Sequence, residues 1–478
     1  MVELRRRGDW PFAAPPAAAP RHDERFNVAE ARTINLTGDL TTSGILVTSA
    51  VGNNVSTITG GNLTGPTSSD LVVIQNNPSN VLTIGSTIIN NTTTNLTKAG
   101  AGTLELTATN SYTGPTTVTG GVLKLTSSAL GLPGGIAFAG GSSNLTLKGG
   151  VLGLMSDFSR GLGTAVDKVQ FTGDGGFAAY GADRAVNFGA TATWTTGSFV
   201  PIGFALLLSA PDATHTVDFQ SPLSLQTGSG PQLREIRVAD GAATVDAKIS
   251  GIISSSFGLV KTGPGTLELS AANTYRGATQ IDGGTLLLTG TIVVQSSGEG
   301  SAFYVNNGST LKIGANGVAG GHPFFVSAGS VDFTGAFSYT AVGLTMGGGA
   351  AGTTSSVTTG ATGTMAIGND GVFYNGHFNN DNGATISGNL ALTSATDAAV
   401  RNRTFTVGNS VNATNDLSIS AVISNGGTGQ SNGLTKLGPG TLNLSGTSTY
   451  TGLTTVSAGT LAYGVSDALS SGAVTVAR

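Results

Sequence analysis

Apolar and polar residues alternate along most of this chain in short runs that glycine, asparagine or proline interrupts. In residues 33–65, for example, Thr, Ile, Leu and Val alternate with Gly and Asn, and no helical period is visible. The run Thr103–Thr107 places Leu104 and Leu106 on one side and polar residues on the other. This period of two predicts half-buried β-strands separated by tight turns.

One pattern of strands and turns occurs three times without a gap, at residues 96–125, 259–288 and 434–463. Each copy opens with a lysine and two glycines, which predicts a turn because glycine adopts positive φ without strain. These recurring residues are Lys98, Gly100 and Gly102, then Lys261, Gly263 and Gly265, then Lys436, Gly438 and Gly440. Each copy is therefore one structural module.

The spacing within each module predicts how its strands stack. The same interval of 19 residues separates a leucine of the first complete strand from a leucine of the last. The pairs are Leu104 and Leu123, Leu267 and Leu286, and Leu442 and Leu461. A coil of that length, with rungs about 4.8 Å apart, places one leucine above the next. We predict an all-β fold, a single-stranded parallel β-helix (β-solenoid) with a right-handed coil and a continuous column of inward leucines.

At these residues the chain resembles a known repeat family. The pattern K-x-G-x-G-T-L-x-L, followed by Y-x-G-x-T and G-x-L, is similar to the autotransporter-associated β-strand repeat, also called the passenger-associated transport repeat. The resemblance implies an exported, non-enzymatic β-helical passenger at the bacterial cell surface or outside the cell. It also implies the outer-membrane translocation machinery as a partner.

Composition is consistent with a narrow repetitive core. Of 478 residues 74 are glycine and 10% are charged, yet 39% are hydrophobic, which is more than a disordered chain carries. The net charge is −4 with scattered basic residues, so we expect no nucleic-acid partner. There is no cysteine, which removes disulfides and thiolate metal sites.

The two ends of the chain carry their own sequence features. Residues 1–30 begin with a basic cluster, but prolines break the apolar stretch that follows, so we expect a disordered or truncated leader without a signal peptide. Residues 31–478 show no linker and are expected to form one continuous β-helix, with a loop excursion near residues 157–168 that is the place where a helical turn is most expected. The strand-like text up to Arg478 suggests a passenger-like fragment that lacks the C-terminal barrel of complete autotransporters.

Residues that often carry chemistry are scattered. Four histidines have no partner at metal-ligand spacing, namely His22, His215, His322 and His377. Six aspartates stand singly beside glycine or between apolar residues, which favours turns that bond their own backbone over paired catalytic carboxylates. They are Asp174, Asp183, Asp218, Asp240, Asp246 and Asp332.

Three other motifs favour a structural interpretation. Residues 347–352 fit G-x-G-x-x-G with Asp370 further on, but the Thr- and Ser-rich text after them cannot open a helix for a phosphate. Asn369–Gly371 and Asn379–Gly383 resemble calcium turns, but the tandem nonapeptide of calcium-binding coils is absent, so ordinary turns are favoured. The recurring tyrosines are expected to pack against turns rather than stack on sugars, and they are Tyr112, Tyr275 and Tyr450.

We therefore predict no catalytic, cofactor-binding or metal-binding residues and no small-molecule cofactor. The preferred function is a structural passenger or stalk. An adhesin that binds glycans or host surfaces along one face is the alternative, and other copies of the chain are a further possible partner. A polysaccharide lyase or hydrolase would need several of the aspartates to converge with a basic residue in one groove.

Overall fold

The computed structural model describes residues 2–5, 31–126, 131–137, 141–226, 232–292, 302–314, 321–333, 338–394, 399–469 and 471–477. The predicted leader, residues 1–30, lies outside these ranges except for β1 (Val2–Arg5), which pairs antiparallel with β4 (Gly44–Val47). In the described part of the chain no helix has the length and apolarity needed to cross a membrane.

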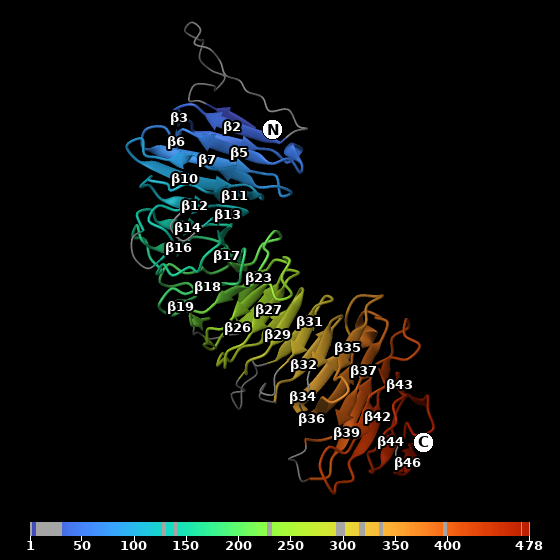
Figure 1. The fold of residues 1–478 in the computed structure, drawn as a ribbon. Helices are drawn as coiled ribbons and strands as arrows, with labels where there is room; N and C mark the ends of the chain where they lie inside the picture. The colour runs from blue at the N-terminus through green and yellow to red at the C-terminus, as the bar shows by residue number, and fades with distance from the viewer. Residues whose placement is uncertain are drawn as a thin grey trace. The chain divides into compact units, whose positions relative to one another are not determined.

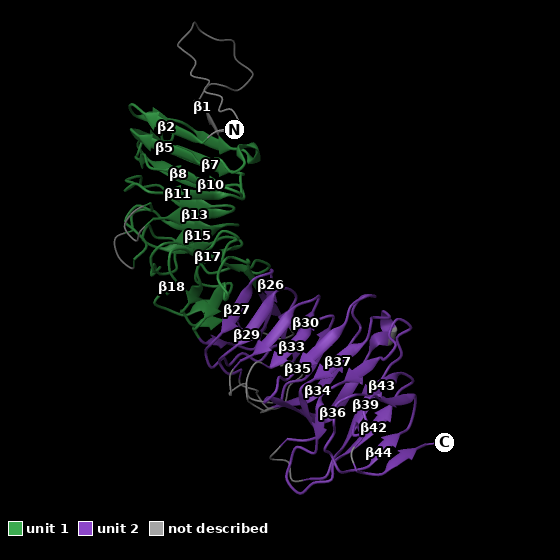
Figure 2. Ribbon diagram, turned by 45° about the vertical axis from the view of Figure 1, so that its right-hand side comes forward, with its two compact units in different colours: residues 1–224, 236–251 green, residues 225–235, 252–478 purple. Residues whose placement is uncertain are grey.

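The chain forms two compact units, which Figure 2 colours separately. Unit 1 comprises residues 1–224 and 236–251, and unit 2 comprises residues 225–235 and 252–478. Each unit by itself is a stack of short parallel strands (Figure 1). The parallel β-helix predicted from the 19-residue spacing is confirmed in both, whereas one continuous β-helix over residues 31–478 stays a prediction.

Unit 1 has two main sheets and several short strands. Sheet 1A consists of β1, β4, β7 (Ser69–Gln75), β10 (Thr94–Ala99), β12 (Thr116–Val118), β14 (Leu145–Leu147) and β16 (Val169–Phe171). Sheet 1B consists of β2 (Arg32–Leu36), β5 (Ser56–Gly60), β8 (Leu82–Ile84), β11 (Thr103–Leu106), β13 (Val122–Leu125), β15 (Val151–Leu154), β17 (Gly175–Ala179), β20 (Leu206–Leu208) and part of β23 (Leu233–Val238). The short strands are β3 (Leu40–Thr41), β6 (Asn62–Thr64), β9 (Thr87–Ile88), β18 (Arg184–Val186), β19 (Ala192–Thr193), β21 (Val217–Phe219), β22 (Leu223–Ser224) and β24 (Ala247–Ile249).

Unit 2 repeats this plan with longer sheets. Sheet 2A consists of β26 (Gly258–Thr262), β28 (Thr279–Ile281), β30 (Phe303–Asn306), β32 (Phe324–Ser327), β34 (Ser338–Met346), β36 (Thr364–Tyr374), β39 (Asn402–Val407), β42 (Gly433–Leu437), β44 (Thr454–Val456) and β46 (Val474–Val476). Sheet 2B consists of β27 (Thr266–Leu269), β29 (Thr285–Leu288), β31 (Thr310–Ile313), β33 (Ser330–Phe333), β35 (Ser355–Thr358), β37 (Ala384–Ser387), β40 (Leu417–Ile419), β43 (Thr441–Leu444) and β45 (Thr460–Tyr463). The remaining strands are β25 (Ile253–Ser254), β38 (Asn389–Ala391) and β41 (Val422–Ser424).

The predicted leucine columns are present. Leu104 pairs in register with Leu123, and Leu123 pairs with Leu152 of the next coil; all three are fully buried. The other repeats show the same register, with the pairs Leu267 and Leu286, and Leu442 and Leu461. Each repeat thus spans two successive coils, because it supplies two strands to the A sheet and two to the B sheet.

Aromatic side chains fill the interior between the first two repeats. Phe171, Phe188, Phe199 and Phe219 pack with tilted or edge-on rings, and Trp194 lies 5.6 Å from Phe199 between ring centres. Such packing fills a wider coil than leucine alone can. The helical turn predicted near residues 157–168 is wrong, because that segment forms bridges and turns; the described 3-10 turns are η1 (Ser49–Val51) and η2 (Gly376–Phe378).

Candidate functional site

Each repeat holds a buried lysine whose amino group is bound by three backbone carbonyls. Lys98 follows Leu96 on the inward side of β10 and is fully buried. Its Nζ donates to the carbonyls of Ala99 at 3.0 Å, Gly100 at 2.8 Å and Gly120 at 2.9 Å. The first two carbonyls belong to the turn after β10 and the third to the same turn of the next coil. The lysine therefore ties two rungs together, and we call this contact the lysine clamp.

The clamp recurs in the second and third repeats. Lys261 donates to the carbonyls of Thr262, Gly263 and Gly283 at 3.2, 2.6 and 2.8 Å. Lys436 donates to those of Leu437, Gly438 and Ala458 at 2.9, 2.7 and 3.0 Å. An ammonium group has three N–H donors and no acceptor, so three carbonyls satisfy it completely.

Two effects act on the charge of these lysines. Burial lowers the pKa of Lys98 to about 7 and that of Lys436 to about 8, because desolvation disfavours the ammonium. The clamp carbonyls act in the opposite direction, since a neutral amine has only two N–H donors for three acceptors. The sequence reading treated the lysine as part of a turn and missed this role. The sequence does contain a signal for its burial. Lys98 lies two residues after the inward Leu96, and side chains two residues apart on a strand point to the same face.

The repeated tyrosine is a core residue. Each of the three is at most 1% exposed, and each hydroxyl hydrogen-bonds the Oγ1 of the threonine four residues later. The pairs are Tyr112 and Thr116 at 2.7 Å, Tyr275 and Thr279 at 2.6 Å, and Tyr450 and Thr454 at 2.7 Å. Burial raises the pKa of all three phenols. The predicted packing role is confirmed, so these tyrosines are not a row for sugar stacking.

The glycine before the last strand of each repeat is required by its backbone. Gly121, Gly284 and Gly459 have φ of 59°, 59° and 70°, in the left-handed region that favours glycine. A Cβ on Gly284 would lie 2.4 Å from the carbonyl oxygen of Gly265 in the preceding coil. A side chain at this position would therefore push neighbouring coils apart beside the lysine clamp.

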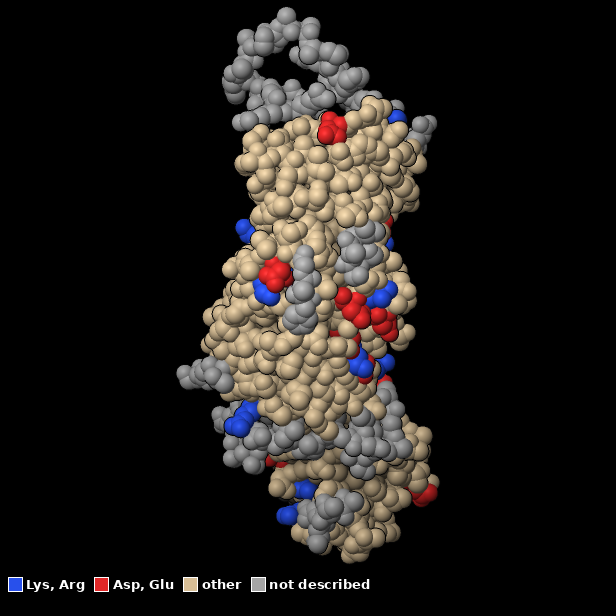
Figure 3. Space-filling model, turned by 60° about the vertical axis from the view of Figure 1, so that its left-hand side comes forward, with Lys and Arg blue, Asp and Glu red and all other residues tan. Residues whose placement is uncertain are grey.

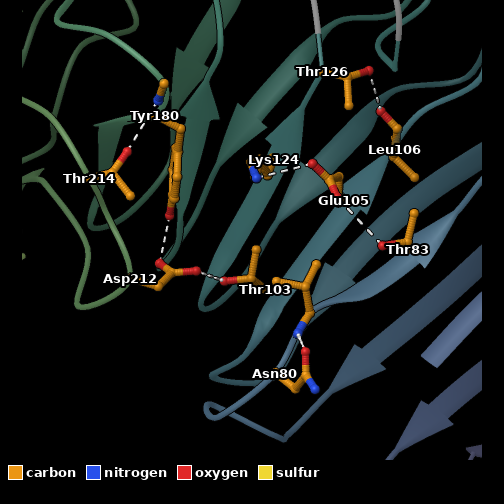
Figure 4. Close-up of polar contacts among 12 residues, drawn as sticks. Asn80, Thr83, Thr103, Glu105, Leu106, Lys124, Thr126, Tyr180, Asp212 and Thr214 are labelled. Atoms are coloured by element: carbon orange, nitrogen blue, oxygen red, sulfur yellow. Dashed lines mark hydrogen bonds and ion pairs between the residues drawn. The ribbon is translucent and has the colours of Figure 1, made fainter. Parts of the chain in front are cut away.

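A cluster of polar side chains lies on the outer face of sheet 1B, as Figure 4 shows. Asp212, in the loop after β20, accepts hydrogen bonds from Tyr180 Oη and Thr103 Oγ1, both at 2.6 Å. Beside it, Lys124 forms an ion pair with Glu105 at 3.0 Å, and its Nζ lies 5.0 Å from the centre of the Tyr180 ring. Burial, with the carboxylate of Asp212 beside it, raises the pKa of Tyr180, so the phenol stays protonated and donates.

Apolar contacts hold the same loop on the sheet. Ala210 and Ala213 are 3% and 2% exposed, and they pack with Val122, Val151 and Ala178 on the outer side of β13, β15 and β17. The loop thus covers a patch of sheet 1B that would otherwise face water. The polar side chains of the loop and of the sheet below it bond one another, which is typical of a structural contact rather than of a reactive site.

The aspartates singled out from the sequence mostly join neighbouring coils. Asp183 accepts a hydrogen bond at 3.0 Å from the backbone N–H of Thr216, and Asp174 accepts one at 2.8 Å from that of Ala205. The predicted bonding to their own turn is therefore wrong for these two, whereas Asp246 does accept from Gly241 in its own turn at 2.7 Å. The others are Asp218, which accepts from Ser250; Asp332, opposite Lys312 in register; and Asp240, in the loop after β23.

The histidines singled out from the sequence do not form a metal site within the described residues. His322 is buried with its ring 5.1 Å from that of Phe303, and His215 lies 2.8 Å from the hydroxyl of Thr214. His22 lies outside the described residues, and the side chain of His377 does too. Within the described ranges, no group of three or more His, Asp or Glu side chains is arranged to hold a metal ion.

The two predicted asparagine turns differ from each other in the structure. Asn369–Gly371 lies inside β36, at a β-bulge where the register with β34 shifts. In Asn379–Gly383, Asp381 accepts from the N–H groups of Gly348 and Gly383 at 3.0 and 3.2 Å and from the Tyr374 hydroxyl. The carboxylate is thus already bonded by protein groups. One of these groups is a backbone N–H of the glycine-rich motif at residues 347–352.

The surface carries few charges. Figure 3 shows a face that is mostly uncharged, on which acidic and basic side chains lie next to each other rather than in patches of one sign. This distribution agrees with the net charge of −4 and offers no extended basic footprint on the face shown.

Comparison with known proteins identifies the repeats. Residues 96–125, 259–288 and 434–462 match the family model described as passenger-associated-transport-repeat. The chain contains three passenger-associated-transport-repeats. It is also 30% identical over 321 residues to the protein named adhesin BmaC autotransporter of Brucella suis biovar 1 (strain 1330). The matched segment covers 66% of this chain and 8% of that relative.

No solved structure matches the chain. The resemblance predicted from the K-x-G-x-G-T-L-x-L pattern is confirmed, and the matched residues of these repeats contain all three lysine clamps and all three tyrosine–threonine pairs.

Proposed function

We propose that this chain is part of an exported bacterial surface passenger in which the β-helix acts as a structural stalk. The observation that carries the proposal is the use of the recurring residues: the lysines and leucines of all three repeats join one coil to the next, and the tyrosines are buried and bonded to a threonine of their own turn. A repeat whose recurring residues are buried supports a mechanical role rather than chemistry. The autotransporter name of the relative supports export through the outer membrane.

The mechanism we propose is progressive ordering. Each coil pairs only with its neighbours, so a chain emerging from the translocation machinery adds one rung at a time to a completed edge. The lysine clamp fits this process, because its third carbonyl becomes available only when the next coil arrives. Residues 31–478 would then form one continuous β-helix.

The test is the location of the full-length gene product in its own cells. An epitope tag in the exposed turn at Gly308 reports the protein, and we expect it in the outer-membrane or extracellular fraction, where protease added to intact cells removes it. A cytoplasmic protein that protease reaches only after lysis would overturn the proposal.

An adhesin is the second candidate. The relative is named an adhesin, and unit 2 exposes aromatic side chains on one sheet face, whereas four of the six aspartates singled out from the sequence provide structural hydrogen bonds. Adhesion of cells carrying the gene, compared with a deletion strain, separates the two roles. Equal adhesion by both strains would contradict the adhesin role and leave the stalk as the one supported function.

A further inference from the structure

A row of aromatic side chains follows the outer face of sheet 2A. In register, Tyr304 of β30 pairs with Phe325 of β32, Phe325 with Thr345 of β34, and Thr345 with Phe373 of β36. Tyr304 is 36% exposed and Phe373 38%. Large apolar side chains in this β-helix otherwise point mainly inward, and contiguous exposed ones mark binding surfaces. We call these four residues the aromatic ladder.

The ladder contains a space above Thr345. The rings of Tyr304 and Phe325 are stacked, with centres 4.9 Å apart and planes at 10°. Tyr304 therefore covers one face of the Phe325 ring, and the other face is turned toward the rung of Thr345. Threonine is too short to cover a ring, so this face stays available. Phe373 closes the far side of the space.

The size of this space indicates what fits. Rungs are about 4.8 Å apart, so Phe325 and Phe373 are separated by about 9.6 Å across Thr345. Van der Waals contact takes about 3.8 Å on each side, which leaves roughly 2 Å of thickness for the atoms of an inserted group. A saturated ring with axial C–H groups on both faces fills this gap better than a flat aromatic ring, whose atoms all lie in one plane.

A column of polar side chains runs beside the ladder. Asp282 accepts hydrogen bonds from Gln280 at 2.6 Å and Asn306 at 3.0 Å, and Ser327 follows Asn306 in register. These groups can exchange hydrogen bonds with hydroxyls. Asp282 is the one charged residue among them and the ladder, and both its oxygens already accept. The exposed Asp370 beside Gly343 is acidic as well, so these residues provide no positive charge for an anionic ligand.

We propose that the aromatic ladder binds a neutral saccharide chain, with one pyranose ring seated above Thr345 between Phe325 and Phe373. The C–H groups of a pyranose carry partial positive charge and meet the negative face of an aromatic ring. The hydroxyls of the same sugar then reach Ser327, which lies on the rung of Phe325. This inference gives the ligand class for the adhesin role and rests on that second candidate function.

The test is calorimetric titration of the purified full chain with cellohexaose, maltohexaose and hexa-N-acetylchitohexaose. We expect at least one of these to bind and Phe373→Thr to weaken it at least tenfold. Thr345→Phe should also abolish binding, because it fills the space while continuing the aromatic stack and so preserves the fold. Tyr463→Thr is the matched control, since Tyr463 is a 64% exposed tyrosine on sheet 2B, and it should bind as the wild type does.

Three outcomes would overturn the inference. None of the three oligosaccharides binds; binding survives both ladder variants; or the chain self-associates in sedimentation and Thr345→Phe abolishes association, which would make the ladder an interface between copies. The titration uses purified protein and is independent of export. A failed titration therefore leaves the passenger proposal standing, and a cytoplasmic location leaves a positive titration standing.

Discussion

At the scale of single residues, stability in this protein depends on how buried polar groups find partners. A lysine inside a narrow apolar core would be costly if its ammonium had no acceptors. The clamp provides three carbonyls at 2.8–3.0 Å around Lys98, two from its own coil and one from the next. The lysine and the two turns therefore stabilise each other.

Removing one clamp tests this dependence. Lys98→Met retains length and apolar bulk but leaves three buried carbonyls without their donor, so the free energy of unfolding should fall by about 3 kcal/mol. Urea unfolding measures the change. Lys148→Met, at an exposed lysine of the same unit, should change it by less than about 0.5 kcal/mol. Equal effects from the two variants would show that the clamp does not stabilise the fold.

The same lysine predicts a pH dependence. Burial holds the pKa of Lys98 near 7 in the folded chain, against 10.5 when free, so between these values the unfolded chain binds more protons and stability rises with pH. The urea midpoint should therefore increase from about pH 7.5 to about pH 9.5, and Lys98→Met should reduce that increase, leaving the part that the buried Lys436 contributes. Above about pH 10 the trend reverses, because the raised pKa of buried Tyr112 keeps its proton in the folded state alone. A midpoint that stays flat across the lower window would mean that the carbonyls hold the proton against burial.

A glycine comparison separates backbone strain from coil contact. Gly284→Ala places a methyl group 2.4 Å from a carbonyl oxygen at positive φ, whereas Gly308→Ala has positive φ but open space around it. The first should cost about 3 kcal/mol and the second about 1 kcal/mol in thermal or urea unfolding. If the two costs were alike, close approach of the coils would contribute nothing at Gly284.

At the scale of elements, the strand in its coil is the unit of stability. Individual strands are three to eleven residues long in the sheets that carry the repeats, and none could persist alone. Each is held by the strand above and the strand below, with an inward leucine, valine or isoleucine completing the column. Damage to one rung should therefore remain local.

Leu267→Asp tests the locality of damage. The variant buries a charge in the leucine column of β27, so hydrogen exchange should become fast in β27, β29 and their neighbours in sheet 2A, while β10–β15 in unit 1 keep wild-type protection. Leu287→Asp is the control, because Leu287 points outward on β29 and is only half-buried. Simultaneous loss of protection throughout the chain would contradict the rung-by-rung account.

At the scale of the whole molecule, the chain has low charge and several of its described carboxylates accept hydrogen bonds from the protein. The described residues hold no group of three acidic or histidine side chains suited to a metal, and Asp381 is occupied by backbone N–H groups and a phenol. The two units should therefore keep their stability without divalent cations.

Calcium removal tests that statement. The melting temperature of the full chain should be the same with excess calcium and with EDTA, because the Asp381 carboxylate of Asn379–Gly383 already accepts hydrogen bonds from two backbone N–H groups and a phenol. Asp381→Asn in parallel should lower the melting temperature in both buffers alike. A calcium-dependent rise that Asp381→Asn removes would restore the calcium interpretation of Asn379–Gly383.

The amino-acid sequence by itself determined the strands, the inward residues and the three repeats. These depend on local alternation and on a fixed interval inside the repeat, so Leu104 and Leu123 could be placed one above the other before any coordinates. The inward position of Lys98 could also be counted along its own strand, and only the expectation that a lysine faces solvent hid its burial.

Only the tertiary structure decided which outward residues became neighbours. Coil lengths vary between the repeats, so the register that places Tyr304, Phe325, Thr345 and Phe373 in one row cannot be counted from the sequence. The same holds for Asp212, which reaches Thr103 from a loop several coils away. The physical reason is that inward positions are selected by the hydrophobic effect at every rung, whereas outward alignment depends on the accumulated lengths of turns.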